Sequence, residues 1–137
     1  MIKGLNHITL SVSDLDRSLA FYCELLGFKR RAVWKNGAYL EAGNIWLALL
    51  VDVSTIQTGR ADYSHIAFDC DRSSFQQLSN TLANAGYASW QENKSEGDSY
   101  YFCDPDGHKL EIHVGDLETR LASMKEEPWA EFKFFDD

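Results

Sequence analysis

The amino-acid sequence predicts an α+β fold built from two β-α-β-β-β modules. Each half of the chain holds stretches in which apolar and polar residues alternate, as strands require, together with one apolar stripe at helical spacing. The order of these elements in the first half recurs in the second. Two histidines, His7 and His65, stand 58 residues apart at matching places, and the glycines that end the two helices, Gly27 and Gly86, match at a spacing of 59.

The first module covers about residues 1–52 and opens with an alternating strand over 5–12. Ser13 or Asp14 is expected to cap the helix that follows, and Gly27 fits the left-handed residue that ends it. Strands are then expected over 29–34, 38–41 and 45–51, with turns at residues 36–37 and 43–44. The apolar stripe of the helix consists of Leu15, Leu19, Tyr22 and Leu25 or Leu26.

The second module covers about residues 62–115 and repeats this order after a polar linker. A strand over 63–68 precedes a helix that stops at Gly86, and its apolar stripe consists of Phe75, Leu78, Leu82 and Ala85. Strands are expected over 87–92, 99–103 and 108–114, with a loop at 93–98 and a turn at 104–107. Residues 116–137 form a tail, in which 117–125 reads as a helix and 128–135 as an edge strand. We expect one domain, 1–137.

Composition limits the partners of the chain. The net charge is −8, which argues against nucleic acid or an anionic membrane as the main partner, because both need a basic surface. No apolar run approaches the roughly 20 residues of a membrane span, and the first residues show no signal-peptide pattern, so a cytoplasmic protein is expected. The three cysteines, Cys23, Cys70 and Cys103, are interpreted as reduced thiols of the core.

Three side chains form a candidate metal centre. His7 and His65 occupy equivalent places in their strands, and the pseudo-symmetry of the repeat would bring them together. Glu111 lies between apolar neighbours, where an inward carboxylate is costly unless it is paired or metal-bound. Two imidazoles and one carboxylate suit a divalent ion such as Mn, Fe, Co, Ni or Zn.

The first-module counterpart of Glu111 falls near residues 46–48, where no ligand-type side chain stands. We therefore expect three protein ligands and an open coordination position for substrate. His113 is a competing ligand, since it lies two residues beyond Glu111 and shares its face of the strand. His108 follows a turn and is expected to be exposed.

Several motifs carry a resemblance to a known family. They are Asn6-His7-Ile8-Thr9-Leu10, Gly37-Ala38-Tyr39-Leu40, Asp62-Tyr63-Ser64-His65, Asn93-Lys94-Ser95-Glu96-Gly97-Asp98-Ser99-Tyr100-Tyr101-Phe102 and Asp104-Pro105-Asp106-Gly107-His108-Lys109-Leu110-Glu111. Together they resemble the fosfomycin-resistance glutathione transferases of the FosA class, in the glyoxalase or vicinal oxygen chelate superfamily. The resemblance covers nearly the whole chain, and the loop at 93–99 is its most specific part.

The resemblance implies a domain-swapped homodimer of paired modules. Mn(II) would be held by His7 of one subunit with His65 and Glu111 of the other, and would bind the oxirane and phosphonate oxygens of fosfomycin. Glutathione thiolate would then open the epoxide at the carbon that bears the phosphonate. A divalent cation suits this chemistry because it stabilises the charge that develops on the leaving oxygen.

The resemblance also assigns roles around the reacting atoms. Tyr39 would assist deprotonation of the glutathione thiol, Thr9 would hydrogen-bond the substrate, and Trp46 would form a wall beside its methyl group. The phosphonate would be bound by Tyr63, Gln91, Ser95, Ser99, Tyr101 and Arg120. The loop would hold an activating K⁺ through Asn93, Ser95, Glu96, Gly97 and Ser99.

One residue departs from the family pattern. Gln91 stands where the family commonly has a lysine that contacts the phosphonate, and an amide supplies no charge. Charge-assisted hydrogen bonds are about twice as strong as neutral ones, so Gln91 in place of lysine is expected to weaken binding of the phosphonate.

Two alternatives stay open. The first is epoxide hydrolysis or transfer of another thiol, as in sister branches, with Glu41 as the nearest carboxylate that could act as a base. The second is a drug-binding protein without catalysis, which would usually lack a full ligand set.

Overall fold

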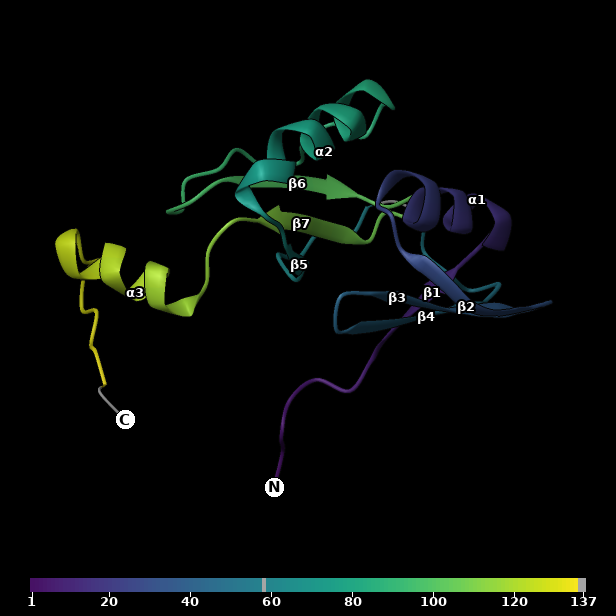
Figure 1. The fold of residues 1–137 in the computed structure, drawn as a ribbon, viewed down its shortest axis with the longest axis horizontal. Coiled ribbons are helices and arrows are strands. Elements are labelled where there is room, and N and C mark those ends of the chain that lie inside the picture. The colour runs from purple at the N-terminus through teal and green to yellow at the C-terminus, as the bar shows by residue number, and fades with distance from the viewer. Residues whose placement is uncertain (58, 136–137) are drawn as a thin grey trace.

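The computed structural model describes residues 1–57 and 59–135, and within them the chain forms two sheets with helices packed against them (Figure 1). The first sheet has the strand order β1-β4-β3-β2, with β1 at Ile8–Val12, β2 at Lys29–Trp34, β3 at Gly37–Ala42 and β4 at Ile45–Val51. The second has the order β5-β7-β6, with β5 at Ile66–Asp69, β6 at Ser99–Cys103 and β7 at Lys109–His113. The prediction of a mixed α+β fold is confirmed.

The two sheets share a register that makes the internal repeat visible. In each module the first strand pairs in parallel with the last, and the remaining strands pair antiparallel. Thr9 pairs with Ala48, which pairs with Tyr39, and in the second sheet Ala67 pairs with Glu111, which pairs with Tyr101. Ala48 is therefore the counterpart of Glu111, and the expected absence of a ligand-type side chain there is confirmed.

The helix of the first module is not a continuous α-helix. Asp14 caps α1 (Leu15–Leu19) by accepting a hydrogen bond from the backbone N–H of Arg17, and a π-helical turn, η1 (Ala20–Leu25), follows. The wider turn places two adjacent side chains, Phe21 and Tyr22, in the core. Gly27 then reverses the chain at φ +79°, as its position in the sequence predicts.

Two predicted strands are absent from the described part of the chain. Residues 87–92 are not a strand: their backbone makes one hydrogen bond to β6, from the N–H of Trp90 to the carbonyl of Tyr101 at 3.1 Å. Side chains make other bonds there, since the Trp90 indole donates to the carbonyls of Phe102 and Leu110, and the Ser89 hydroxyl donates to the carbonyl of Gln91. Residues 128–135 follow α3 (Leu117–Glu126) without strand pairing, and Glu131 reverses the chain at φ +62°.

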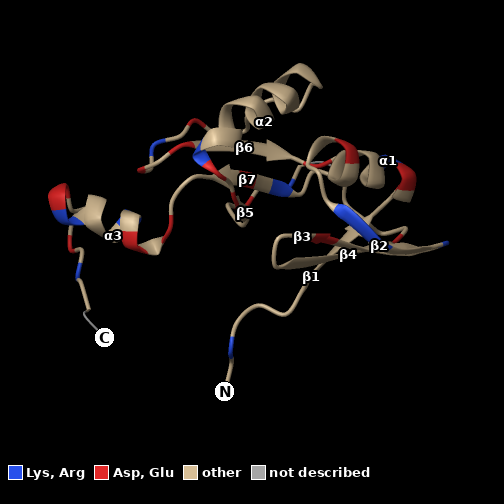
Figure 2. Ribbon diagram, in the orientation of Figure 1, with Lys and Arg blue, Asp and Glu red and all other residues tan. Residues whose placement is uncertain are grey.

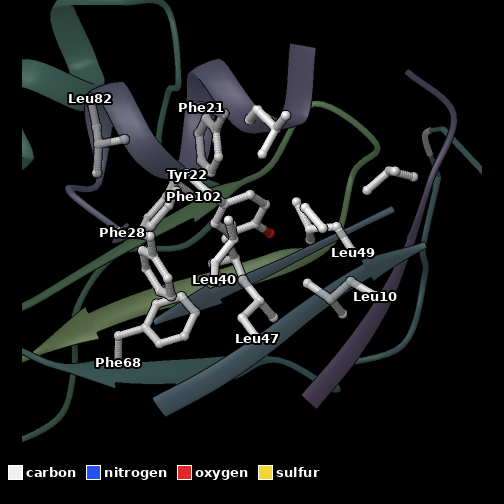
Figure 3. Packing of buried hydrophobic residues seen from close by; sticks show 14 of the residues in the cluster. Leu10, Phe21, Tyr22, Phe28, Leu40, Leu47, Leu49, Phe68, Leu82 and Phe102 are labelled. Carbon is white, nitrogen blue, oxygen red and sulfur yellow. The ribbon is translucent and has the colours of Figure 1, made fainter. Parts of the chain in front are cut away.

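One apolar core joins the two modules. Figure 3 shows Phe21 and Tyr22 of the first helix near Phe28 and Phe102, with leucines from β1, β3 and β4 below them. Phe68 of the second sheet packs against Phe28. Helix α2 (Arg72–Asn84) covers the second sheet with Leu82 fully buried, while α1 and η1 cover the first (Figure 1). Because the helices take one face of each sheet, the residues that alternate with the core positions lie on the opposite face.

The modules are also joined by a polar hub in the turn between β6 and β7. The buried Asp106 carboxylate accepts hydrogen bonds from the backbone N–H of Ser13 at 3.2 Å, the Ser13 hydroxyl at 2.5 Å and Arg17 at 3.2 Å. His108, expected to be exposed, is half-buried instead, because its Nε2 lies 2.8 Å from the carbonyl oxygen of Ser11. Side chains of the second module thus fix the start of the first helix.

The surface of the described residues agrees with an acidic protein. Figure 2 shows Asp and Glu over both modules and α3, while the main basic group lies at the start of β2. No described helix is long and apolar enough to cross a membrane. The three cysteines are free and half-buried, and burial raises the pKa of each thiol, which disfavours the reactive thiolate.

Candidate active site

His65 and Glu111 form the centre of the candidate site, on the face of the second sheet opposite the core. Nε2 of His65 lies 3.0 Å from Oε1 of Glu111, whose side chain is buried. Nδ1 of His65 lies 2.9 Å from the carbonyl oxygen of Tyr63, which can only accept, so Nδ1 carries the hydrogen. Nε2 of His65 is therefore the ring nitrogen directed at the carboxylate, either as a donor to it or as a ligand beside it for a shared cation.

Two lone-pair atoms at this separation fit a shared cation. Metal-bound histidines characteristically donate their other ring N–H to a carbonyl or carboxylate, as His65 does here. An imidazole and a carboxylate suit Mn(II) and related divalent ions. Within residues 1–57 and 59–135, however, no three His, Cys, Asp or Glu side chains converge in metal-binding geometry. One chain therefore supplies two of the three predicted ligands at one place.

The second carboxylate oxygen of Glu111 also has a hydrogen-bond partner. Ser99, on the neighbouring strand β6, places its Oγ 2.6 Å from Oε2 of Glu111 and 2.6 Å from Nδ1 of His113. His113, the competing ligand, has its Nδ1 3.6 Å from Oε2 of Glu111 and its Nε2 3.4 Å from Oε1 of Glu96. The same oxygen of Glu96 accepts from Nε of Arg120 at 3.1 Å.

The loop at 93–98 lies beside His113 and Arg120, at the edge of the candidate site. Asn93 donates to the carbonyl of Gly97 at 2.8 Å, and its Oδ1 accepts from both the backbone N–H and the hydroxyl of Ser95. Gly97 has φ +73°, and a side chain there would collide with the carbonyl oxygen of Val114. The loop is thus fixed against β7 by a residue that must be glycine.

Aromatic rings frame His65. Tyr63 packs edge-on against it with ring centroids 5.0 Å apart, and Trp90 and Tyr101 follow at 5.7 and 6.1 Å. Gln91 donates from its amide to the hydroxyl of Tyr63 at 2.8 Å. Sequence reasoning did not single out Trp90, although its indole hydrogen bonds place the segment that carries Gln91.

The first sheet carries the remaining predicted residues, also on its face opposite the core. His7 directly precedes β1, and its ring centroid lies 4.5 Å from that of Trp46, which lies 5.4 Å from Tyr39. Thr9 is in register with Ala48 and Tyr39 in the same row. Tyr39 and Trp46 are about 40% exposed, so these rings form an open aromatic surface.

The predicted site residues thus fall into two groups within one chain. His7, Thr9, Tyr39 and Trp46 share the first sheet, and the others gather on and around the second, namely Tyr63, His65, Gln91, Asn93, Ser95, Glu96, Gly97, Ser99, Tyr101, Glu111 and Arg120. An open hollow of about 530 Å³ borders His65 on the side of His108 and of the linker between the modules. The structure of a single chain leaves the two groups on separate sheets.

The fold and these motifs define a class of protein. The family model of the glyoxalase/bleomycin resistance protein/dioxygenase superfamily matches residues 4–112, and the chain belongs to this superfamily. Within it, the chain is 48% identical to the glutathione transferase FosA of Serratia marcescens over 100% of this chain and 99% of that protein. The resemblance to the FosA class is therefore confirmed.

Two further relatives place the chain among fosfomycin-resistance proteins. It is 39% identical to the metallothiol transferase FosB of Staphylococcus haemolyticus (strain JCSC1435), over 92% of this chain and 94% of that one. A Glu-to-Gln mutant of the fosfomycin resistance protein FosX of Listeria monocytogenes, solved with Mn(II) and 1S,2S-dihydroxypropylphosphonic acid, superposes with a TM-score of 0.77 at 28% identity. That match covers 88% of this chain and 99% of the FosX chain.

Proposed function

We propose that the protein inactivates fosfomycin by adding glutathione to its epoxide. The observation that carries the proposal is the full-length similarity to a glutathione transferase of the FosA class, together with a His65–Glu111 pair in metal-ligand geometry. In the reaction the sulfur bonds to the carbon bearing the phosphonate, the bond from that carbon to the epoxide oxygen breaks, and the proton lost by the thiol balances the one gained by the oxygen.

We propose further that two chains complete the site. His65 and Glu111 of one subunit and His7 of the other would hold the metal in a domain-swapped homodimer. A bound Mn(II) would supply Lewis-acid stabilisation of the epoxide oxygen. The separation of His7 from the other ligands supports this arrangement, because the open face of each sheet carries only part of the ligand set.

The remaining residues would bind, orient and move protons. Tyr39 would help to take the proton from the thiol. Thr9, which lies in the same row of the sheet with Ala48 between them, would donate a hydrogen bond to the substrate. Arg120 and the hydroxyls of Tyr63 and Tyr101 would bind the phosphonate, and Trp46 would pack against the methyl group. The loop from Asn93 to Ser99 would hold an activating K⁺ through its oxygens.

A direct assay tests this function. Purified protein with Mn(II), K⁺, glutathione and fosfomycin is expected to consume free thiol and form a product whose mass is the sum of glutathione and fosfomycin. Omission of Mn(II) after chelation is expected to abolish turnover. Absence of the adduct with all components present would rule the proposal out.

Hydrolysis is the second candidate, because one structural relative was solved with a dihydroxypropylphosphonic acid. In this chain the candidate base, Glu41, lies on the first sheet and accepts a hydrogen bond from Arg31 at 3.0 Å, so its carboxylate is already engaged. Mass spectrometry separates the candidates, since the diol exceeds fosfomycin by one water and forms without glutathione. An adduct formed only with a different thiol would point to the FosB-like alternative.

The departure at Gln91 gives a graded prediction. Gln91→Lys is expected to lower the KM for fosfomycin about tenfold, because a charged donor contributes roughly 1–1.5 kcal/mol more than a neutral one. Gln91→Met removes the donor to Tyr63 at similar length and is expected to raise the KM. Steady-state kinetics at saturating glutathione measure both variants, and equal KM values in all three proteins would show that residue 91 does not affect phosphonate binding.

A further inference from the structure

We propose that Trp90 is a positioning residue that fixes Tyr63 and Gln91 at the phosphonate-binding end of the site, and that Lys109 holds the Trp90 ring in place. This inference rests on the proposed function, which assigns Tyr63 to the phosphonate. Neither Trp90 nor Lys109 would touch the substrate. Both would act through the two residues that they place.

Trp90 is bound to the second sheet through backbone carbonyls, although its own segment is not a strand. Its backbone N–H donates to the carbonyl of Tyr101 at 3.1 Å, and its indole N–H donates to the carbonyls of Phe102 and Leu110 at 2.9 and 3.3 Å. Phe102 and Leu110 are paired across β6 and β7, so the indole is bound to two strands at once. The backbone of the sheet therefore sets the orientation of the ring.

The Trp90 ring is in turn a packing surface for the residues of the site. It packs edge-on against Tyr101, His65 and Tyr63, with ring centroids 5.2, 5.7 and 5.9 Å away. The next residue, Gln91, donates to the hydroxyl of Tyr63 at 2.8 Å. Tyr63 is 58% exposed, so these two contacts, rather than burial in the core, decide where it lies.

Lys109 joins Trp90 to the chain segment that carries Tyr63. Its Nζ lies 5.1 Å from the centroid of the Trp90 ring and donates to the carbonyl of Asp62 at 2.6 Å. An ammonium group in this place is attracted by the electron-rich face of the indole. One side chain of β7 therefore ties Trp90 to the residue directly before Tyr63.

The chemistry of the substrate gives this arrangement a kinetic signature. The phosphonate keeps all its bonds in the reaction, so contacts to it are about as strong in the bound substrate as in the transition state. Misplacement of Tyr63 and Gln91 is therefore expected to raise the KM for fosfomycin and to leave kcat nearly unchanged. Damage to the metal centre would instead lower kcat and the affinity for Mn(II).

Two variants test the two residues. Trp90→Phe keeps a ring beside His65 but removes the indole donor, and it is expected to weaken fosfomycin binding about tenfold. Lys109→Met keeps the length of the side chain but removes the ammonium group, and about fivefold weaker binding is expected. Lys109→Arg is expected to restore binding, since a guanidinium can also donate and lie over an aromatic ring.

Fosfomycin affinity is measured by calorimetric titration of the Mn(II)-loaded protein without glutathione, and KM and kcat by steady-state kinetics with it. Mn(II) affinity, measured by electron paramagnetic resonance, and kcat are expected to stay within about threefold of the wild type in Trp90→Phe. Melting temperatures show that each variant is folded.

A double variant separates positioning by Lys109 from a direct effect of its charge. If Lys109 acts through the ring, Trp90→Leu already removes its effect, and Trp90→Leu with Lys109→Met is expected to bind about as weakly as Trp90→Leu alone. If the two losses multiply instead, Lys109 does not act through Trp90 and that part of the inference is overturned.

The C-terminal part of the chain offers matched controls. Trp129→Phe makes the same change in an exposed tryptophan, and Lys125→Met removes an ammonium group that lies 5.6 Å from the centroid of the Phe134 ring. Fosfomycin affinity is expected to equal that of the wild type in both.

The outcomes distinguish this inference from the proposed function. Unchanged fosfomycin affinity in Trp90→Phe and Lys109→Met would overturn the positioning role, as would equal losses of fosfomycin and Mn(II) affinity. Fosfomycin affinity that depends on both residues as expected, without turnover when glutathione is added, would overturn only the proposed function. A Mn(II)-loaded wild-type protein that binds no fosfomycin would overturn both.

Discussion

Replacing Glu111 with glutamine is expected to lower kcat for glutathione addition by about 10³-fold, which corresponds to about 4 kcal/mol of transition-state stabilisation. The amide is nearly the same size as the carboxylate but carries no charge, so it is a poor ligand for a divalent ion. It would also change the contacts at both oxygens, which face Nε2 of His65 at 3.0 Å and the Ser99 hydroxyl at 2.6 Å. Turnover and metal content after dialysis measure the effect.

Glu24→Gln is the matched control for this experiment, because it makes the same chemical change on the exposed helical side of the first module. Its kcat and bound Mn(II) are expected to equal those of the wild type. If Glu111→Gln retains stoichiometric Mn(II) and more than about a tenth of wild-type kcat, Glu111 is not a metal ligand.

Removing the Asp106 side chain is expected to cause the largest loss of stability. Asp106→Ala leaves the backbone N–H and the hydroxyl of half-buried Ser13 without their acceptor, and each unsatisfied group shielded from water costs about 1–3 kcal/mol. Arg17 also loses its ion pair, but its side chain is 43% exposed and can turn to water. We expect a loss of about 3 kcal/mol in the free energy of unfolding and a melting temperature lower by about 10 °C. Urea denaturation and calorimetry measure these quantities.

Asp104→Asn provides the comparison within the same turn. Burial raises the pKa of Asp104, although hydrogen bonds from Tyr22 and two backbone N–H groups oppose this shift. A neutral isostere avoids the cost of burying charge and keeps an acceptor oxygen, so it is expected to lose only about 1 kcal/mol. Equal losses from the two substitutions would show that the Asp106 contacts do not hold the modules together.

Alternating polarity and turn residues predict most of the fold. The three later strands of the first module and both helices that end at glycine appear where the sequence places them. Burial selects β3, β4 and the helices, whereas β2 is exposed along its whole length. One of the two missing strands fails for a local reason. Over 87–92 the backbone makes a single bond to β6, while the side chains of Ser89 and Trp90 bind backbone carbonyls, and alternation cannot reveal such competition.

The sequence predicts the positions of some candidate-site residues better than those of others. The repeat and the strand periodicity are enough to place His65 near Glu111, because His65 directly precedes β5, which pairs with the strand that carries Glu111. The contact of Gln91 with Tyr63 joins a loop to the start of a strand 28 residues away, and no periodic pattern links them. The partner of His7 stays a prediction, since one chain holds it on the other sheet.

The matched registers of the two sheets have a consequence for the history of the molecule. Thr9, Ala48 and Tyr39 stand at the positions that Ala67, Glu111 and Tyr101 occupy in the other module. If both modules descend from one duplicated segment, their equivalent rows have since specialised. One row has kept the acid that suits a cation, and the other has a small residue flanked by hydroxyls. Such a duplication would let selection act separately on the two proposed roles, metal ligation and proton transfer.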